Sequence, residues 1–151
     1  AQDTSGLRQT RHRFVERSTA LTQRLRVDER FRGEHEFVAR LIGFRLSAGG
    51  AILRPRTPVS VGWMRAAFAP PGEAFAAVLN ADGALGPARV LLACNPHDQA
   101  VTLAVPSPGP WHPVVLSPFP SCPHAPGPVP TLVGDRLELP PLGCGVWSIG
   151  A

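Results

Sequence analysis

Between residues 75 and 117 the chain holds four short apolar runs, each ended by turn-forming residues. They are FAAVLN, ARVLLACN, QAVTLAVP and GPWHPVVLS. Runs of about 4–8 residues rich in Val and Leu, bounded by Gly, Pro, Asn and Asp, are typical of strands. Val101, Leu103 and Val105 alternate with smaller or polar residues, as in a half-buried strand. The pattern predicts the core of an antiparallel β domain.

Two helices are predicted ahead of these strands. The first covers about residues 7–31, and the second covers residues 34–46. In the second, Phe37, Leu41 and Phe44 fall on one stripe of the helix because residues three and four apart share a face. This apolar stripe requires a partner surface, which the sequence alone does not identify.

Further strands are predicted on both sides of the four central runs. They are Val59–Trp63, residues 137–139 and Cys144–Ile149, while the proline-rich residues 118–130 are expected to form an irregular surface excursion. The fold class expected is mainly β: an antiparallel β-sandwich of about seven or eight strands preceded by two α-helices. The domain organisation expected is a helical segment over residues 1–50 and a sandwich over residues 51–151.

The net charge of +4 is confined to the helical part of the chain. Residues 1–45 hold ten Arg against six acidic residues, whereas residues 46–151 are balanced. Two interpretations remain open, a solvated helix face or a helix that binds an acidic partner or nucleic acid. The second interpretation would use Arg8, Arg11, Arg13 and Arg17 as nucleic-acid contacts.

Membrane, metal and cofactor sites are not expected. The longest apolar run is far shorter than the roughly 20 residues that a membrane-spanning helix needs. Cys94, Cys122 and Cys144 are far apart and form no C-x2-C pair, so no metal ligand set is predicted. We expect reduced cysteines in structural roles, which favours an intracellular compartment such as cytoplasm or plastid.

The residues that could carry chemistry are few and dispersed. No G-x-S-x-G elbow, phosphate-binding G-x-x-x-x-G-K-[ST] loop or G-x-G-x-x-G run occurs, and no catalytic residue is predicted. Trp63, Trp111 and Trp147 lie in or beside predicted strands, where they could fill a core or stack on sugar rings. Trp111, which follows a Pro-Gly-Pro turn, is the candidate for a glucan contact.

Residues 34–149 resemble the C-terminal part of the debranching enzymes of the α-amylase superfamily, the isoamylase and pullulanase group. The segments that carry the resemblance are a helix, a first strand and a series of later strands. In this sequence they read Phe37-Val-Ala-Arg-Leu-Ile-Gly-Phe-Arg45, Val59-Ser-Val-Gly-Trp63, Val78-Leu-Asn80, Leu91-Leu-Ala-Cys-Asn95, Val101-Thr-Leu-Ala-Val-Pro106 and Trp111-His-Pro-Val-Val-Leu116.

The resemblance implies a non-catalytic β-sandwich that stabilises a catalytic (β/α)8 barrel, in cis or in trans, and that contacts α-glucan. Phe37, Leu41 and Phe44 are then the expected docking residues, with either the sandwich itself or the barrel as their partner surface. The chain is too short to hold such a barrel, which takes about 250 residues. The alternative from another class is a structural subunit of a large assembly whose Arg-rich first helix binds RNA or an acidic partner.

Overall fold

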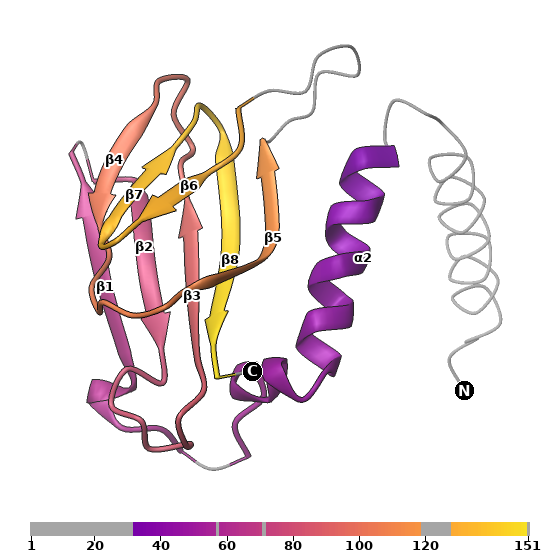
Figure 1. Ribbon diagram of the computed structural model, residues 1–151, viewed down its shortest axis with the longest axis vertical. Coiled ribbons are helices and arrows are strands. Elements are labelled where there is room, and N and C mark those ends of the chain that lie inside the picture. The colour runs from indigo at the N-terminus through magenta and orange to yellow at the C-terminus, as the bar shows by residue number, and fades with distance from the viewer. Residues whose placement is uncertain (1–31, 57, 71, 119–127, 151) are drawn as a thin grey trace, which may run out of the picture.

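The computed structural model describes residues 32–56, 58–70, 72–118 and 128–150. In these residues, eight strands form two antiparallel sheets preceded by an α-helix and two 3-10 helices (Figure 1). The helices are α2 (Arg32–Leu46), η2 (Gly49–Leu53) and η3 (Val61–Trp63). The strands are β1 (Met64–Ala69), β2 (Ala74–Leu79), β3 (Arg89–Cys94), β4 (Val101–Ala104), β5 (His112–Pro118), β6 (Thr131–Val133), β7 (Arg136–Leu139) and β8 (Gly143–Ile149).

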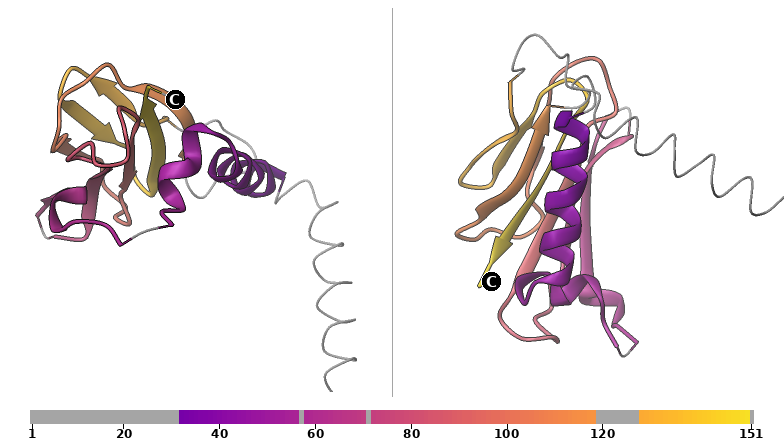
Figure 2. Two further views of the ribbon diagram at one scale, coloured as in Figure 1. Left: turned by 90° about the horizontal axis from the view of Figure 1, so that it is seen from below. Right: turned by 90° about the vertical axis from the view of Figure 1, so that its right-hand side faces the viewer.

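The larger sheet has the strand order β1-β2-β3-β8-β5, and the smaller sheet has the order β4-β7-β6. The two sheets face each other as the layers of a sandwich, and α2 lies beside β5 at one edge (Figures 1 and 2). The predicted fold class, a mainly β antiparallel sandwich, is therefore confirmed. The predicted first helix falls outside the described residues.

The inner core lies between the two sheets. Strand residues alternate between the two faces of a sheet, so one set of side chains from each strand enters this core. Its members come from both sheets and are almost completely buried: Ala74, Ala76, Val78, Leu91, Leu103, Leu137, Leu139 and Trp147. The alternation predicted for β4 is confirmed, since Leu103 is buried while Thr102 and Ala104 are exposed.

A second apolar cluster lies on the opposite face of the larger sheet, here called the outer face. It joins Val90, Val115 and Val146 to Ile52 of η2 and to the α2 side chains. β3, which was predicted to be a central strand, contributes to both clusters because adjacent residues Val90 and Leu91 point to opposite faces. Helix α2 and η2 thus pack on the outer face of the larger sheet.

The prediction of a strand at Val59–Trp63 is wrong, because Val61–Trp63 form the 3-10 helix η3. Trp63 N donates to the Ser60 carbonyl at 3.2 Å, which closes a 3-10 turn, and the Ser60 hydroxyl donates to Asp82. Strand β1 begins only at Met64. β1 was not predicted from the sequence because three of its six residues are alanine, which has little preference for strands.

Asn80 determines the turn between β2 and β3. Its backbone is left-handed (φ 56°), a conformation that asparagine tolerates better than most residues. The buried side-chain amide donates to the carbonyls of Gly86 (2.9 Å) and Ala88 (2.7 Å), and its oxygen accepts from Leu85 N (2.9 Å). One side chain therefore satisfies three backbone groups of this loop.

Asn95 has the same function at the other end of β3. Its buried amide donates to the carbonyls of Gln99 (2.7 Å) and Pro140 (2.9 Å), and its oxygen accepts from His97 N (3.1 Å). The contact with Pro140 joins the β3–β4 loop to the β7–β8 turn, which is far away in the sequence. Asn95 therefore links the two sheets at this end of the sandwich.

None of the helices in the described residues has the length and hydrophobicity that a membrane span requires.

Helix α2 is followed by the 3-10 helix η2. This position of η2 requires glycine, because a Cβ atom at Gly50 would lie 1.9 Å from the Phe44 carbonyl oxygen. The close approach of Gly50 to Phe44 lets the chain turn sharply after α2. Ile52 then packs in the same apolar cluster as the α2 side chains.

Asn95→Ala is expected to lower the free energy of unfolding by about 3 kcal/mol, because buried carbonyl and N–H groups lose their partners. Chemical denaturation monitored by circular dichroism measures this change. The control is Asp98→Ala in the same loop, whose side chain is exposed and whose replacement should change stability by less than about 0.5 kcal/mol. Equal effects of the two substitutions would contradict the role assigned to Asn95.

Candidate functional site

The outer face of the larger sheet is apolar across four strands. The strand registers place its positions opposite one another. They are Met64, Ala66, Phe68, Phe75, Ala77, Leu79, Val90, Leu92, Cys94, Cys144, Val146 and Ser148. None of these residues carries a charge, so the face has the composition of a surface that is normally covered.

Helix α2 and η2 cover only one half of the outer face. Phe37, Leu41 and Phe44 are half-buried and pack on the cluster formed by Val115 and its neighbours. The half formed by β1 is open: 53% of Met64 and 64% of Phe68 are exposed. β1 is the edge strand farthest from α2 (Figure 1).

The helix also carries a second apolar stripe that the described residues leave uncovered. Val38, Ile42 and Leu46 follow one another at intervals of four, with exposed fractions of 51%, 54% and 67%. At about 100° per residue this stripe is centred roughly 130° around the helix from the stripe that contacts the sheet. We call it the second stripe.

The predicted docking residues Phe37, Leu41 and Phe44 therefore contact the sandwich of their own chain. Val38 and Ile42 were not among the predicted docking residues, although their spacing with Leu46 was the signal for a separate stripe. Met64 and Phe68 were missed because β1 was not predicted. Their alternation with charged and small residues along MRAAFA was the available signal.

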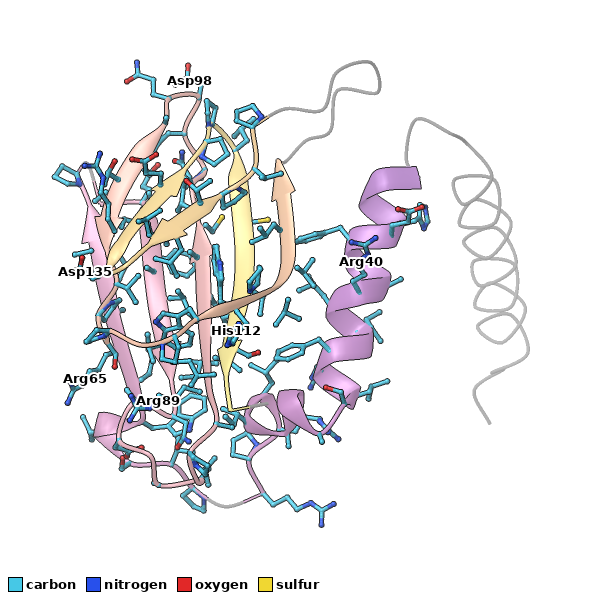
Figure 3. The ribbon with its side chains drawn as sticks, in the orientation of Figure 1. Arg40, Arg65, Arg89, Asp98, His112 and Asp135 are labelled. Atoms are coloured by element: carbon cyan, nitrogen blue, oxygen red, sulfur yellow. The ribbon has the colours of Figure 1, made fainter. Side chains whose placement is uncertain are left out.

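The acidic side chains of the sandwich do not assemble a catalytic pair. Glu73, Asp82, Asp98, Asp135 and Glu138 are all exposed. Asp98 lies at the top end of the sandwich in Figure 3, and Asp135 lies lower down, at its left side. Glycoside hydrolysis requires two carboxyl groups on opposite sides of one scissile bond, and the described residues offer no such arrangement.

Two of these carboxylates have local structural partners. The Ser60 hydroxyl, followed by the backbone N–H of Ala84, holds the pKa of Asp82 below its ordinary value of 3.8. Glu138 forms an exposed ion pair with Arg136 at 3.1 Å. Among the described residues, no three His, Cys, Asp or Glu side chains are close enough to hold a metal ion.

Trp111, the predicted glucan contact, is half-buried against the inner core. Its indole N–H donates to the Ser107 carbonyl at 3.1 Å. That hydrogen bond commits the polar edge of the ring to the chain itself, so a sugar could be contacted only through the exposed part of the ring face. The glucan contact stays a prediction.

A shallow groove of about 290 Å³ lies at the end of the smaller sheet. Its lining is mainly proline and small apolar residues, with Glu138 as the charged member. It contains no paired acid and base. Arg8, Arg11, Arg13 and Arg17 lie outside the described residues, and their nucleic-acid role also stays a prediction.

Cys94 and Cys144 are free thiols on the outer face, and each is half-buried. Burial raises the pKa of Cys94 above its ordinary value of 9.0. Burial, and then the charge of Cys94, raises the pKa of Cys144 to about 11. Both groups are therefore protonated at neutral pH.

Comparison with known proteins adds no family to this geometry. The chain was compared with protein-family models, with curated proteins and with solved structures, and no match was found in any of the three.

The raised thiol pKa predicts how Cys144 reacts with an alkylating reagent. Because only the thiolate reacts, the alkylation rate of the folded chain should rise about tenfold per pH unit from pH 8 and level off only near pH 11. Mass spectrometry of the tryptic peptide 137–151 measures this rate. In denaturant the rate should level off near pH 9, and the same profile in the folded chain would contradict the assigned pKa.

Proposed function

We propose that this chain is a non-catalytic β-sandwich domain of the type found in α-amylase-superfamily debranching enzymes. It would stabilise a catalytic (β/α)8 barrel, present in cis or in trans, by docking on it. The observation that carries the proposal is the second stripe of α2. Because α2 packs one apolar stripe on its own sandwich and exposes another, it could lie between the sandwich and a second protein domain.

The open half of the outer face supports the same proposal. Exposed apolar side chains on an uncharged sheet are costly in water, and such surfaces mark protein–protein contacts. Met64 and Phe68 would extend the contact from α2 across to β1. A large, rigid partner such as a barrel suits a flat sheet face of this width.

In the proposed arrangement, the sandwich has a supporting role. Hydrolysis would then take place on the barrel, and the sandwich would contribute stability and, through Trp111, a contact with α-glucan. Because the Trp111 N–H is bonded to Ser107, this contact would be a stacking interaction of the ring face.

The docking proposal is tested with Ile42→Glu in the second stripe. The partner is a separately produced barrel of a debranching enzyme from which its own sandwich domain has been removed. Analytical ultracentrifugation should show association of the unmodified chain and at least a tenfold weaker affinity for Ile42→Glu, since a buried unpaired carboxylate is strongly unfavourable. Circular dichroism verifies that the variant folds.

Val133→Glu is the matched control, because Val133 is also an exposed apolar residue (77%) but lies on β6 of the other sheet. It should leave the affinity unchanged. Failure of the unmodified chain to associate, or equal losses for both variants, would overturn the docking proposal. Salt-sensitive binding of RNA that disappears on neutralising Arg8, Arg11, Arg13 and Arg17 would favour the assembly subunit instead.

The glucan contact is tested by calorimetric titration with a linear maltooligosaccharide. Trp111→Phe retains an aromatic face and should retain binding, whereas Trp111→Ala should abolish it. Unchanged binding by Trp111→Ala, or no binding by the unmodified chain, would remove the glucan contact and leave the docking proposal standing.

A further inference from the structure

Cys94 and Cys144 lie directly opposite each other on the two neighbouring strands β3 and β8. The adjacent pair in this register is Asn95 and Gly143, in which Asn95 N donates to the Gly143 carbonyl at 2.8 Å. Hydrogen-bonded and non-hydrogen-bonded pairs alternate along an antiparallel ladder. The two cysteines therefore occupy a non-hydrogen-bonded position, where opposite side chains approach most closely.

That position permits a disulfide bond. Opposite Cα atoms at non-hydrogen-bonded positions are about 4.5 Å apart, and disulfides span Cα separations of about 4.4–6.8 Å. Both thiols project from the same face of the sheet, because directly paired residues share a face. The separation is at the short end of the range, which favours a bond that is easily reduced.

The pair is accessible from the outer face. Each cysteine is partly exposed, and the next residue along the same row is Phe75, which pairs with Cys94 from β2. Beyond it lies Phe68, the exposed residue of β1. A small molecule can therefore approach the thiols without opening the sandwich core.

We propose that Cys94 and Cys144 form a reversible redox modification site that is oxidised by low-molecular-weight disulfides. The Cys94 thiolate attacks one sulfur of the small disulfide and releases one thiolate. The Cys144 thiolate then attacks the sulfur of Cys94 in the mixed disulfide and releases the second. Two protein thiols lose two electrons, the small disulfide gains them, and the protons of the protein thiols pass to the two released thiolates.

The reaction order follows from the environment of each thiol. Cys144 carries the higher pKa because it is desolvated and also faces Cys94, so Cys94 supplies the first thiolate. Both thiols are mostly protonated at neutral pH, which makes the exchange slow there and faster in mild alkali. The completed bond would join β3 to β8 across the centre of the larger sheet. This inference does not depend on the proposed function.

The test uses the full chain with Cys122→Ser, which leaves a single thiol pair. The folded chain is equilibrated with oxidised glutathione at pH 8.5, quenched with acid, and digested with trypsin. Cleavage after Arg89 and Arg136 places Cys94 in peptide 90–136 and Cys144 in peptide 137–151. The expected product is a linked pair of these peptides, at least tenfold more abundant than either mixed glutathione disulfide.

Two single-cysteine variants and a measurement of the melting temperature are the controls. Cys94→Ser and Cys144→Ser should each give only a mixed disulfide, and the linked form should have a melting temperature several degrees above the reduced form. Glutathione on both thiols without the linked peptides would overturn the proposal. A linked form that appears only in denaturant, or that melts below the reduced chain, would also overturn it.

Discussion

The larger sheet is apolar on both faces, and the rest of the structure follows from the need to cover it. The smaller sheet buries the inner face, with Leu137 and Leu139 packed against Val78 and Leu91. The outer face is only half covered, by α2 and η2. A sheet with one closed face and one partly open face is a stable scaffold that still has apolar surface available for a partner.

Helix α2 connects this incomplete burial to the proposed function. Its first stripe is held by the sheet, so its orientation is determined by the sandwich, and the second stripe is presented at a defined angle. Asn80 and Asn95 contribute indirectly, because they hold the loops at the two ends of β3 through buried amide hydrogen bonds. In the proposed function, catalysis takes place on the partner.

The sequence predicted β2, β3, β7 and β8 to within about one residue, β4 to within about two and β5 to within about three, because each is a short apolar run bounded by turn-forming residues. It did not predict β1 or β6. β1 is alanine-rich, and β6 has only three residues and depends on pairing with β7. The residues of the proposed docking surface were not predicted. Local periodicity placed Phe37, Leu41 and Phe44 on one stripe, but whether a stripe faces the sheet or the solvent is decided by tertiary packing, and this stripe faces the sheet. The pairing of Cys94 with Cys144, fifty positions apart, likewise depends on strand order.

We propose that a catalytic barrel covers both the second stripe of α2 and the open half of the outer face at β1. Hydroxyl-radical footprinting measures the exposure of individual side chains in the free chain and in the mixture with a barrel. We expect Met64, Phe68 and Ile42 to be protected from oxidation in the mixture, and Val133 to be oxidised equally in both samples. Unchanged oxidation of Met64, Phe68 and Ile42 in a mixture where association is demonstrated would contradict this proposal.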